Sequence, residues 1–583
     1  MANNPNNDAF VQMQKARMDF FNLWRHNNPI CQNYDRRARQ PVLDALQFPR
    51  AGQWPGHVRR TTFPQLYRIV KSSHKGPEEH RRRAQRHATA LDGVLKFADL
   101  RVGRILGWGG LGIACEVEGT KAHGEPLKVV CKVALHDSEK EAMSIEKGWH
   151  ILLAGARHIV QRVVLEERHP VPAGSRHRDD RQTQSQPVGD RAEGQNPASL
   201  ARSQSVGSNG DLLYRRQVMN DVRSFNRRML RTQLDEREDL LFIEFMRRGD
   251  LYNAIGKVSM SGVDFPNQVL WPILDCLFKG VVAMAFPNVW HAEDQDPEHE
   301  NVPQRTEVLD DSLWEPNQVD GTLVHFDLDP QNILVGDYDD DEHSVLPVVK
   351  IADLGLCHDV DILMRTNALD MWGTRKIGKF HIYTPEQFTP EWDYITGAPI
   401  AEPDGDKGTA GNYHWWTNMY QVAQVMWQLI TLHSIECPPV AEAYTINLPD
   451  GTTETRWSYG MLMLDPTYDT IGIDRDLREL IMLCMSHVPS HRPTMKFIDT
   501  ALKEKLRRLG EQPAEHRELV QQFCEQLWTE APPPAQQPAT LAGVAAAQAA
   551  AAPLSFQQGA TQANFQAQQY SASDPVEERR RAG

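Results

Sequence analysis

The chain has 583 residues, a length that allows one large catalytic domain with appendages or several small domains. It carries 63 Lys and Arg against 77 Asp and Glu, a formal net charge of −14, which argues against a protein that holds nucleic acid mainly through a basic surface. The longest purely apolar run near its middle, Val281 to Phe286, is far shorter than the roughly 18 to 20 residues of a membrane-spanning helix, so no membrane span is expected.

The N-terminus, MANNPNNDAF, lacks the positive start and apolar core of a secretory signal. The eight cysteines are scattered without a CxxC spacing, and we interpret them as reduced thiols, not as zinc ligands. We therefore expect the protein in the cytoplasm or the nucleus. Residues 1–95 are expected to form an N-terminal extension, partly helical or disordered. Its basic run, HRRRAQRH (His80 to His87), is typical either of a nuclear-import patch or of a solvated helix face.

Strands come first and helices later in the part of the chain with regular apolar patterns. Short β-like runs joined by the turn GTKAHGE predict an antiparallel sheet, and apolar residues at spacings of three and four predict helices. The expected strands are Leu106 to Glu118, Leu127 to Leu135 and Leu240 to Phe245, and the expected helices are Ser138 to Leu153, Val269 to Ala285, Trp415 to Leu432, Arg475 to Met485 and residues 510–530. This order predicts an α+β protein with a sheet-containing part, a mostly helical part and a cleft between them.

Three segments have a polar composition that predicts little packed structure. The region of about 166–238 is interpreted as an insertion, flexible up to about Gly210 and followed by a solvated basic helix. Residues 292–320 carry ten acids and one Arg, which indicates an acidic surface loop. Residues 531–583 hold 16 Ala, 9 Gln and 6 Pro, too little apolar surface to offset the entropy of ordering, so we expect a disordered tail.

A glycine-rich run, ILGWGGLGIACEV, places Gly107, Gly109 and Gly112 inside an expected hairpin. Glycines let backbone N–H groups approach phosphate oxygens, but they also gather in hairpins because of turn geometry. Lys132 follows in the apolar strand KVVCKVAL, where an unpaired ammonium would be costly. Glu146 on the next expected helix is the candidate partner, with Glu139 and Glu141 as competitors.

The segment TLVHFDLDPQNILVG carries the strongest chemical pattern. Asp327 and Asn332 lie five residues apart between two apolar runs, a spacing that lets a carboxylate face an acceptor hydroxyl while an amide oxygen binds a divalent metal. Further on, VVKIADLGL brings Asp353 to a strand end, where a carboxylate can bridge Mg²⁺ and phosphate. A single Asp is often a turn cap, but that explanation does not account for the three residues together. The intervening acidic turn, GDYDDDEH, is expected to be solvated.

With these motifs in this order, the chain resembles the protein kinase superfamily between about Asp99 and Leu509. The HFDLDPQN and YTPEQF segments are similar to a kinase-like group of filamentous fungi. The resemblance implies a bilobal kinase-like fold over residues 96–509, with a small antiparallel β lobe containing one helix and a larger helical lobe. It also implies ATP and Mg²⁺ as cofactors and a protein as the phosphate acceptor.

The resemblance assigns roles to individual residues. The three glycines match the phosphate-covering loop, Lys132 the strand lysine that binds phosphates, and Glu146 its helix partner. The segment LFIEFMRRGD would bind the nucleotide through the backbone of Glu244 and Met246 and the side chain of Asp250, with Ile243 behind the adenine. Asp327 would accept the proton of the acceptor hydroxyl. The implied metal ligands are Asn332 and Asp353, and Glu386 of TPE is expected to pair with Arg492 as a buried structural ion pair.

Several positions depart from the kinase pattern. Asp329 stands where Ser/Thr kinases usually carry a lysine, which replaces a stabilising cation by an anion; the charge favours a side chain that turns away to cap the local backbone. Phe326 replaces the arginine that clamps a phosphorylated loop, and Asn418 replaces an Asp that anchors the catalytic loop. The residue that positions the acceptor is either Thr374 or Lys379.

The sequence thus favours an active protein kinase, most simply one acting on Ser or Thr. A pseudokinase or nucleotide-binding scaffold is the alternative, because of Asp329 and the long polar segments. A small-molecule phosphotransferase is the third reading, since such enzymes share the H-x-D-x-x-x-x-N pattern.

Overall fold

The computed structural model describes residues 78–108, 112–121, 124–135, 137–166, 226–287, 289–309, 323–360, 373–375, 377–393, 408–435, 439–448 and 450–528. The expectations for residues 1–77, for most of the 166–238 insertion and for the tail 531–583 lie outside these residues.

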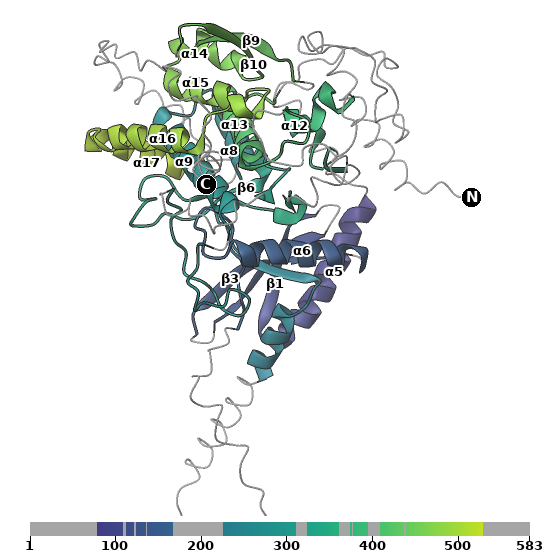
Figure 1. The fold of residues 1–583 in the computed structure, drawn as a ribbon. Coiled ribbons are helices and arrows are strands. Elements are labelled where there is room, and N and C mark those ends of the chain that lie inside the picture. Colours follow the sequence, from purple (N-terminus) through teal and green to yellow (C-terminus); the bar gives the residue numbers. More distant parts are fainter. Residues whose placement is uncertain are drawn as a thin grey trace, which may run out of the picture.

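A four-stranded antiparallel sheet forms the first part of the fold, in the order β1-β2-β3-β4 (Figure 1). Its strands are β1 (Leu100–Trp108), β2 (Ile113–Thr120), β3 (Pro126–Val133) and β4 (Leu240–Glu244). The predicted antiparallel sheet is confirmed, although the run expected as one strand from Leu106 covers the end of β1 and most of β2. Strands β2 and β3 pair in an unbroken register from Ile113 opposite Val133 to Thr120 opposite Pro126.

Each face of this sheet is covered by a helix. The helix α5 (Glu78–Leu95) buries Leu91 and Leu95 in one core with Val117, Cys131 and other inward residues of the sheet. The opposite side of the sheet shares a second core with Met143 of α6 (Asp137–Leu152). We expected the folded domain to begin at residue 96, but α5 is part of the same core, because its apolar residues recur at helical spacing toward the sheet. The folded unit therefore begins no later than Glu78.

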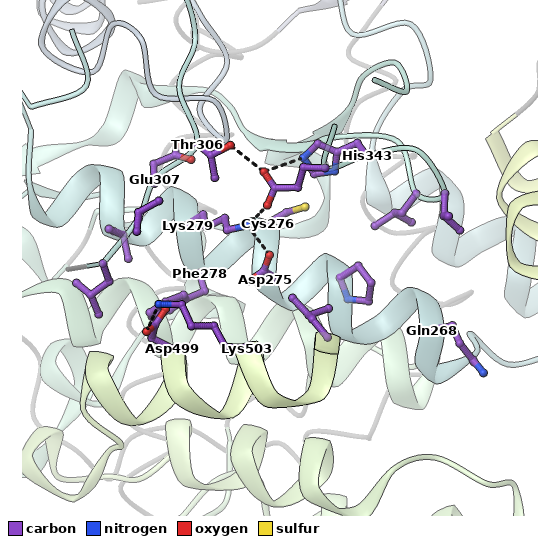
Figure 2. Close-up of a pocket in the computed structure, with 18 residues that line it drawn as sticks. Gln268, Asp275, Cys276, Phe278, Lys279, Thr306, Glu307, His343, Asp499 and Lys503 are labelled. Atoms are coloured by element: carbon purple, nitrogen blue, oxygen red, sulfur yellow. Dashed lines mark hydrogen bonds and ion pairs between the residues drawn. The ribbon is translucent and has the colours of Figure 1, made fainter. Parts of the chain in front are cut away.

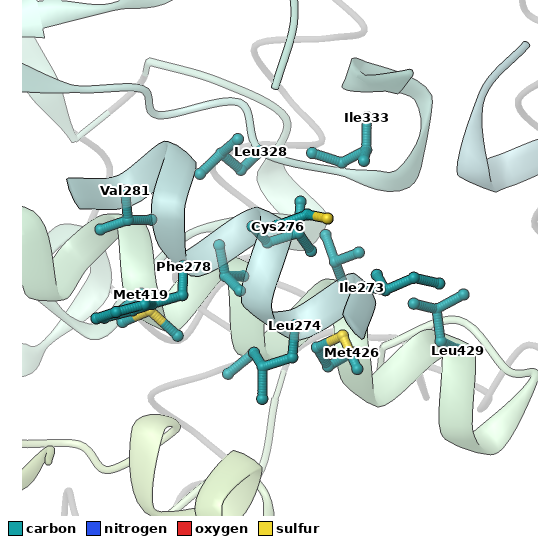
Figure 3. Close-up of a cluster of buried hydrophobic side chains, with 14 of the residues drawn as sticks. Ile273, Leu274, Cys276, Phe278, Val281, Leu328, Ile333, Met419, Met426 and Leu429 are labelled. Atoms are coloured by element: carbon teal, nitrogen blue, oxygen red, sulfur yellow. The ribbon is translucent and has the colours of Figure 1, made fainter. Parts of the chain in front are cut away.

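The second part is mainly helical and is built around α9 (Asn267–Ala285), which is buried along nearly its whole length. Figure 3 shows Leu274 and Phe278 of α9 against Met419 and Met426 of α13 (Trp415–Thr431). Among the described helices α9 is long and apolar enough to cross a membrane, but 78% of that stretch is buried inside the protein. Its apolar composition is thus explained by its place in the core.

The remaining elements surround this core or connect it to the sheet. The longer helices are α8 (Leu251–Ser261), α15 (Arg475–Cys484), α16 (Met495–Gly510) and α17 (Ala514–Trp528). The short strands pair as β5 (Leu323–Val324) with β8 (His358–Asp359), β6 (Ile333–Val335) with β7 (Val349–Ile351), and β9 (Glu442–Asn447) with β10 (Thr453–Ser458). The short helices are η1 (Lys96–Ala98), η3 (Pro330–Asn332), η4 (Leu354–Leu356), η5 (Phe380–Ile382), α12 (Pro385–Phe388), η6 (Pro390–Asp393), η7 (Met461–Leu464), α14 (Thr467–Thr470) and η8 (Pro489–His491). The described residues therefore form a mixed α and β fold with a small antiparallel sheet, as expected for the α+β class.

Three segments expected to be solvated are docked where the structure describes them. Residues 226–235 are helical, but Arg231 is fully buried and donates to the carbonyls of Ala98 and Thr120. In the acidic segment, Glu307 is buried and bonds to His158. Most of the described residues in these two segments are exposed or half-buried, as expected, but Arg231 and Glu307 are not, because composition does not reveal a single charged residue whose partner lies far away in the chain.

The acidic turn before β7 is the third such segment. Asp339 binds Arg157 at 2.5 Å and accepts hydrogen bonds from the backbone N–H groups of Asp341, Glu342 and His343. The turn is thus folded around its own first carboxylate and fixed to the segment after α6.

Candidate active site

Lys132, Glu146 and Asp353 meet between the sheet and the helical part. Lys132 Nζ lies 2.5 Å from Glu146 Oε1 and 2.8 Å from Asp353 Oδ1. The lysine comes from β3 and the glutamate from α6, whereas Asp353 follows β7. Of the competing acids, Glu139 accepts instead from the backbone N–H of Leu135. The predicted pairing of Lys132 with Glu146 is confirmed, and Asp353, which was identified from a separate segment, joins the pair.

The electrostatics of this triad keep all three groups ionised. Lys132 holds the pKa of Asp353 down to about 2. Burial alone would lower the pKa of the Lys132 ammonium, but Asp353 and Glu146 reverse that effect and raise it. The Asp353 side chain remains 50% exposed, and its backbone has a left-handed φ of 62°, a conformation that few non-glycine residues adopt. Lys132 binds Oδ1 of this carboxylate, so its second oxygen remains for another ligand.

The loop that carries Asp327 is held by buried hydrogen bonds. The Asn332 amide donates to Asp327 Oδ2 at 2.9 Å and to the Asp327 carbonyl at 2.6 Å. Asp329 turns toward the backbone and caps η3 by accepting from the N–H groups of Gln331 and Asn332. The cap predicted for Asp329 is confirmed, so its carboxylate stabilises the loop that presents Asp327.

His325 and Asn418 hold the same loop in place through hydrogen bonds. His325 Nε2 donates to the carbonyl of Ala352 at 3.0 Å, and its Nδ1 accepts from the N–H of Asp327; burial lowers the pKa of this imidazole. Asn418 Oδ1 accepts from the His325 N–H, while its Nδ2 donates to the carbonyl of Leu323, both at 2.9 Å. The anchoring expected of Asn418 is confirmed, although an amide replaces the usual carboxylate.

Phe326, the residue in place of the expected arginine, makes apolar contacts instead of ion pairs. It is buried with φ of 63° and packs edge-on against Tyr413. A Cβ on Gly378 would come within 2.0 Å of the Phe326 carbonyl oxygen, so only glycine permits this close approach of the two segments. The loop and the segment before α12 are therefore fixed to each other.

Lys379, adjacent to that glycine, forms the contact that the sequence left open. Its Nζ lies 2.5 Å from Asp329 Oδ2 and 3.2 Å from Asp327 Oδ2. Burial raises the pKa of Asp327 to about 7, an effect that Lys379 opposes and that Asp329 and Asp353 reinforce. Thr374, the other candidate at this position, is buried and bonds to Tyr413. The cation beside Asp327 is thus supplied from outside the loop.

Asp327 has one oxygen left for chemistry. Its Oδ1 is buried and has no hydrogen-bond partner among the described residues, whereas Oδ2 is held by Asn332 and Lys379. An unpaired buried carboxylate oxygen is costly, and such groups are typical of sites that bind or deprotonate a substrate. The pKa of about 7 suits a group that takes up a proton near neutral pH.

Two of the three expected phosphate-covering glycines lie among the described residues. Gly107 has open space where a Cβ would stand, while a Cβ on Gly112 would come within 2.4 Å of the Val133 carbonyl; Gly109 lies outside the described residues. Gly112 therefore also has a structural reason to be glycine.

The segment after β4 has side chains engaged in the fold. The Glu244 carboxylate accepts from Lys350 and from the N–H of Gln161, both at 2.7 Å. Met246 is buried. Asp250 caps α8 by accepting from Asn253, and burial raises its pKa to about 6. The Glu244 N–H also donates to the Gln161 carbonyl at 2.9 Å, which leaves the Glu244 carbonyl and the Met246 backbone for the adenine contact expected here, whereas both Asp250 oxygens already accept from Asn253.

The predicted pair of Glu386 and Arg492 is confirmed. The two side chains are buried and joined by two hydrogen bonds of 2.7 and 3.0 Å, and Glu386 also accepts from Thr417. This pair connects α12 with the segment before α16 and takes no part in the candidate site.

No protein-family model matches the chain, and no curated protein matches it. What can be said of its chemistry therefore rests on the geometry above.

Proposed function

We propose that the protein is an ATP- and Mg²⁺-dependent protein kinase that transfers the γ-phosphoryl group to Ser or Thr hydroxyls. We also infer that the sheet with α5 and α6 acts as the small lobe of a bilobal kinase-like fold, and the helical part as the large lobe. The observation that carries the proposal is the Lys132, Glu146 and Asp353 triad beside a loop whose Asp327 keeps one buried oxygen without a partner.

The donor set fits a hard cation and a triphosphate. Asp353 has a carboxylate oxygen beyond the one that Lys132 binds, and Asn332 has its amide oxygen left once its N–H groups bind Asp327. Mg²⁺ prefers one or two such protein oxygens together with phosphate oxygens. Asn332 and Asp353 would hold the metal, which would neutralise the developing charge of the transferred group. Lys132 would bind the phosphates.

Asp327 would orient the acceptor hydroxyl and take its proton. Oδ2 is fixed by Asn332 and Lys379, so Oδ1 keeps a constant direction, and positioning accounts for much of the rate in such reactions. The backbone of Gly107, Gly109 and Gly112 would cover the phosphates. The Glu244 carbonyl and the Met246 backbone would contact adenine, and Asp250, whose oxygens also accept from Asn253, would contact the ribose.

A nucleotide-binding scaffold is the alternative that Asp329 suggests, since an anion in place of a lysine would weaken catalysis. Lys379 weakens that argument, because its ammonium lies 2.5 Å from Asp329 and returns a cation to the same place. The balance therefore favours an enzyme.

The test is transfer of labelled γ-phosphate from Mg·ATP to a generic acceptor protein or to the chain itself. Asp353→Asn is expected to lower kcat by about 10²-fold or more, the scale of losing one preorganised electrostatic contact. Asp450→Asn, in the β9–β10 turn and far from the triad in the chain, should leave kcat unchanged. Transfer that is insensitive to Asp353→Asn would disprove the assignment, and nucleotide binding without any transfer would favour the scaffold.

A further inference from the structure

Two histidines and a cysteine form a buried cluster outside the candidate active site. His158, Cys276 and His343 are buried, and their donor atoms all lie within 4.8 Å of one another. Cys276 comes from α9, His158 from the segment after α6 and His343 from the β6–β7 connection. Cys276 and His343 line a cavity of about 470 Å³, and Figure 2 shows both side chains at its wall.

The two imidazoles have the spacing of neighbouring ligands. His158 Nε2 lies 3.2 Å from His343 Nε2. Zn–N bonds of about 2.0 to 2.1 Å in a tetrahedral site place two nitrogens roughly 3.3 Å apart. Little movement of the rings is therefore needed to admit an ion between them.

A buried carboxylate orients the first of these rings. His158 Nδ1 donates to Glu307 Oε2 at 2.5 Å, and Glu307 Oε1 accepts from the His158 backbone N–H at 2.9 Å. Metal-binding histidines almost always donate their other ring N–H to such a group, which fixes the tautomer and directs the remaining lone pair to the metal. Glu307 holds His158 in this way, and the other ring nitrogen of His158 lies next to His343.

We propose that His158, Cys276 and His343 form a Zn²⁺ site with its fourth position open to the cavity. Two imidazoles and a thiolate are donors that Zn²⁺ prefers, and three protein ligands with an open position are a known zinc geometry. On binding, the Cys276 thiol and the Nε2–H that lies between the rings each release a proton to solvent. The thiolate and Glu307 then balance the two charges of the ion.

The other charged groups around the cluster are already paired. Lys279 binds Asp275 and Glu342, and Arg157 binds Asp339. Glu342, which also lines the cavity, has its Oε2 3.9 Å from His343 Nε2. Each of these two cations is paired with a carboxylate, which reduces the repulsion that it would exert on a divalent ion.

An ion at this place would join three segments that include the backbone leading to Asp353. The His158 carbonyl accepts from the N–H of Ile351 in β7, and the Ile351 carbonyl accepts from Val160, both at 2.8 Å. Asp353 follows two residues later. An ion bound there would tie α9 and the β6–β7 connection to the segment after α6, while its fourth position stays open to the cavity.

The experiment uses the purified full chain, stripped of metal and titrated with Zn²⁺ against a chromophoric chelator. We expect about one equivalent bound to the folded protein. Cys276→Ser and His343→Gln should each weaken binding at least 10²-fold, and Glu307→Gln by about 10- to 100-fold, the usual effect of losing an orienting partner. Cys484→Ser and His487→Gln change buried residues of the same types outside the cluster and should bind as the wild type does.

Co²⁺ provides a direct readout of a thiolate ligand in the wild-type protein. Wild-type protein should show a thiolate-to-Co²⁺ charge-transfer band in the near ultraviolet, present in Cys484→Ser and lost in Cys276→Ser. If the histidines share only a proton, the wild type will bind no stoichiometric Zn²⁺ and show no such band. Either that outcome or binding unaffected by both cluster variants overturns the proposal.

Discussion

Lys379 supplies the positive charge that lies next to Asp327. Two carboxylates, those of Asp327 and Asp329, are buried in one loop, and a cation within 3.2 Å of each offsets their repulsion. The ammonium and carboxylate have exchanged places relative to the kinase pattern, since the anion stands in the loop and the cation comes from the segment before η5. The local charge around Asp327 is thereby retained.

Replacing Lys379 by Met is expected to raise the pKa of Asp327 above about 7, because Lys379 is the group that opposes the effect of burial. A base must be deprotonated, so the acid limb of the kcat profile should move to higher pH. Lys379→Arg keeps a cation and should restore much of the wild-type profile. The measurement is kcat of the three proteins from about pH 5 to 9. An acid limb that stays in place in Lys379→Met would show that Lys379 does not set the pKa of Asp327.

At the scale of elements, the Glu386 and Arg492 pair fixes α12 against the helical part. Both side chains are almost entirely inaccessible, and removing one partner of a buried pair leaves the other charge uncompensated.

Arg492→Met should therefore lower the free energy of unfolding by about 3 to 5 kcal/mol. The double variant Arg492→Met with Glu386→Gln should recover part of this loss. Denaturant unfolding measures both. Arg475→Met, which breaks an exposed pair with Glu479, serves as the control and should cost less than about 1 kcal/mol. Equal losses in the two single variants would contradict the structural role.

The helix α5 is expected to contribute to stability through its apolar side. Leu95→Ala removes a fully buried side chain from the core of the sheet and should cost about 2 to 5 kcal/mol. Phe97→Ala, two residues on and 77% exposed, should change little. If thermal unfolding shows the two variants to be alike, α5 is not part of the core.

The sequence predicts features that depend on residues close together in the chain and misses contacts between residues that are far apart in it. The bounds of α6 and α9 were expected within about two residues, since apolar periodicity is local. The fixed spacing of Asp327 and Asn332 likewise determines their hydrogen bond. The pairing of His158 with Glu307 and the burial of Arg231 depend on residues more than a hundred positions away, and no local pattern reports such contacts. For the same reason the scattered cysteines gave no sign of a cluster around Cys276.

At the scale of the molecule, the long insertion begins and ends at neighbouring points. Glu166, the last described residue before it, binds Arg228 after it at 3.2 Å. The helix of residues 226–235 is in turn held through Arg231 by Ala98 and Thr120. Closing such a loop costs entropy that grows only slowly with its length.

Replacing residues 170–222 by a short Gly/Ser linker is therefore expected to leave the melting temperature and phosphoryl transfer nearly unchanged. Arg231→Ala is the contrasting variant, because it leaves two buried carbonyls without their donor and should cost about 1 to 3 kcal/mol. Calorimetry on the two proteins distinguishes the cases. A large loss of stability from the linker replacement would mean that the removed segment packs against the domain.

The amide of Asn418 gives the loop beneath Asp327 a polarity that a carboxylate cannot copy. One side chain accepts from the His325 N–H and donates to the Leu323 carbonyl, so the two backbone groups have opposite hydrogen-bonding character. An aspartate would present a second acceptor to the Leu323 carbonyl, and the two oxygens would repel. The substitution that looks like a return to the common kinase residue would thus mismatch this backbone. Because an amide has no proton to gain or lose, Asn418 can keep both hydrogen bonds while Asp327 titrates.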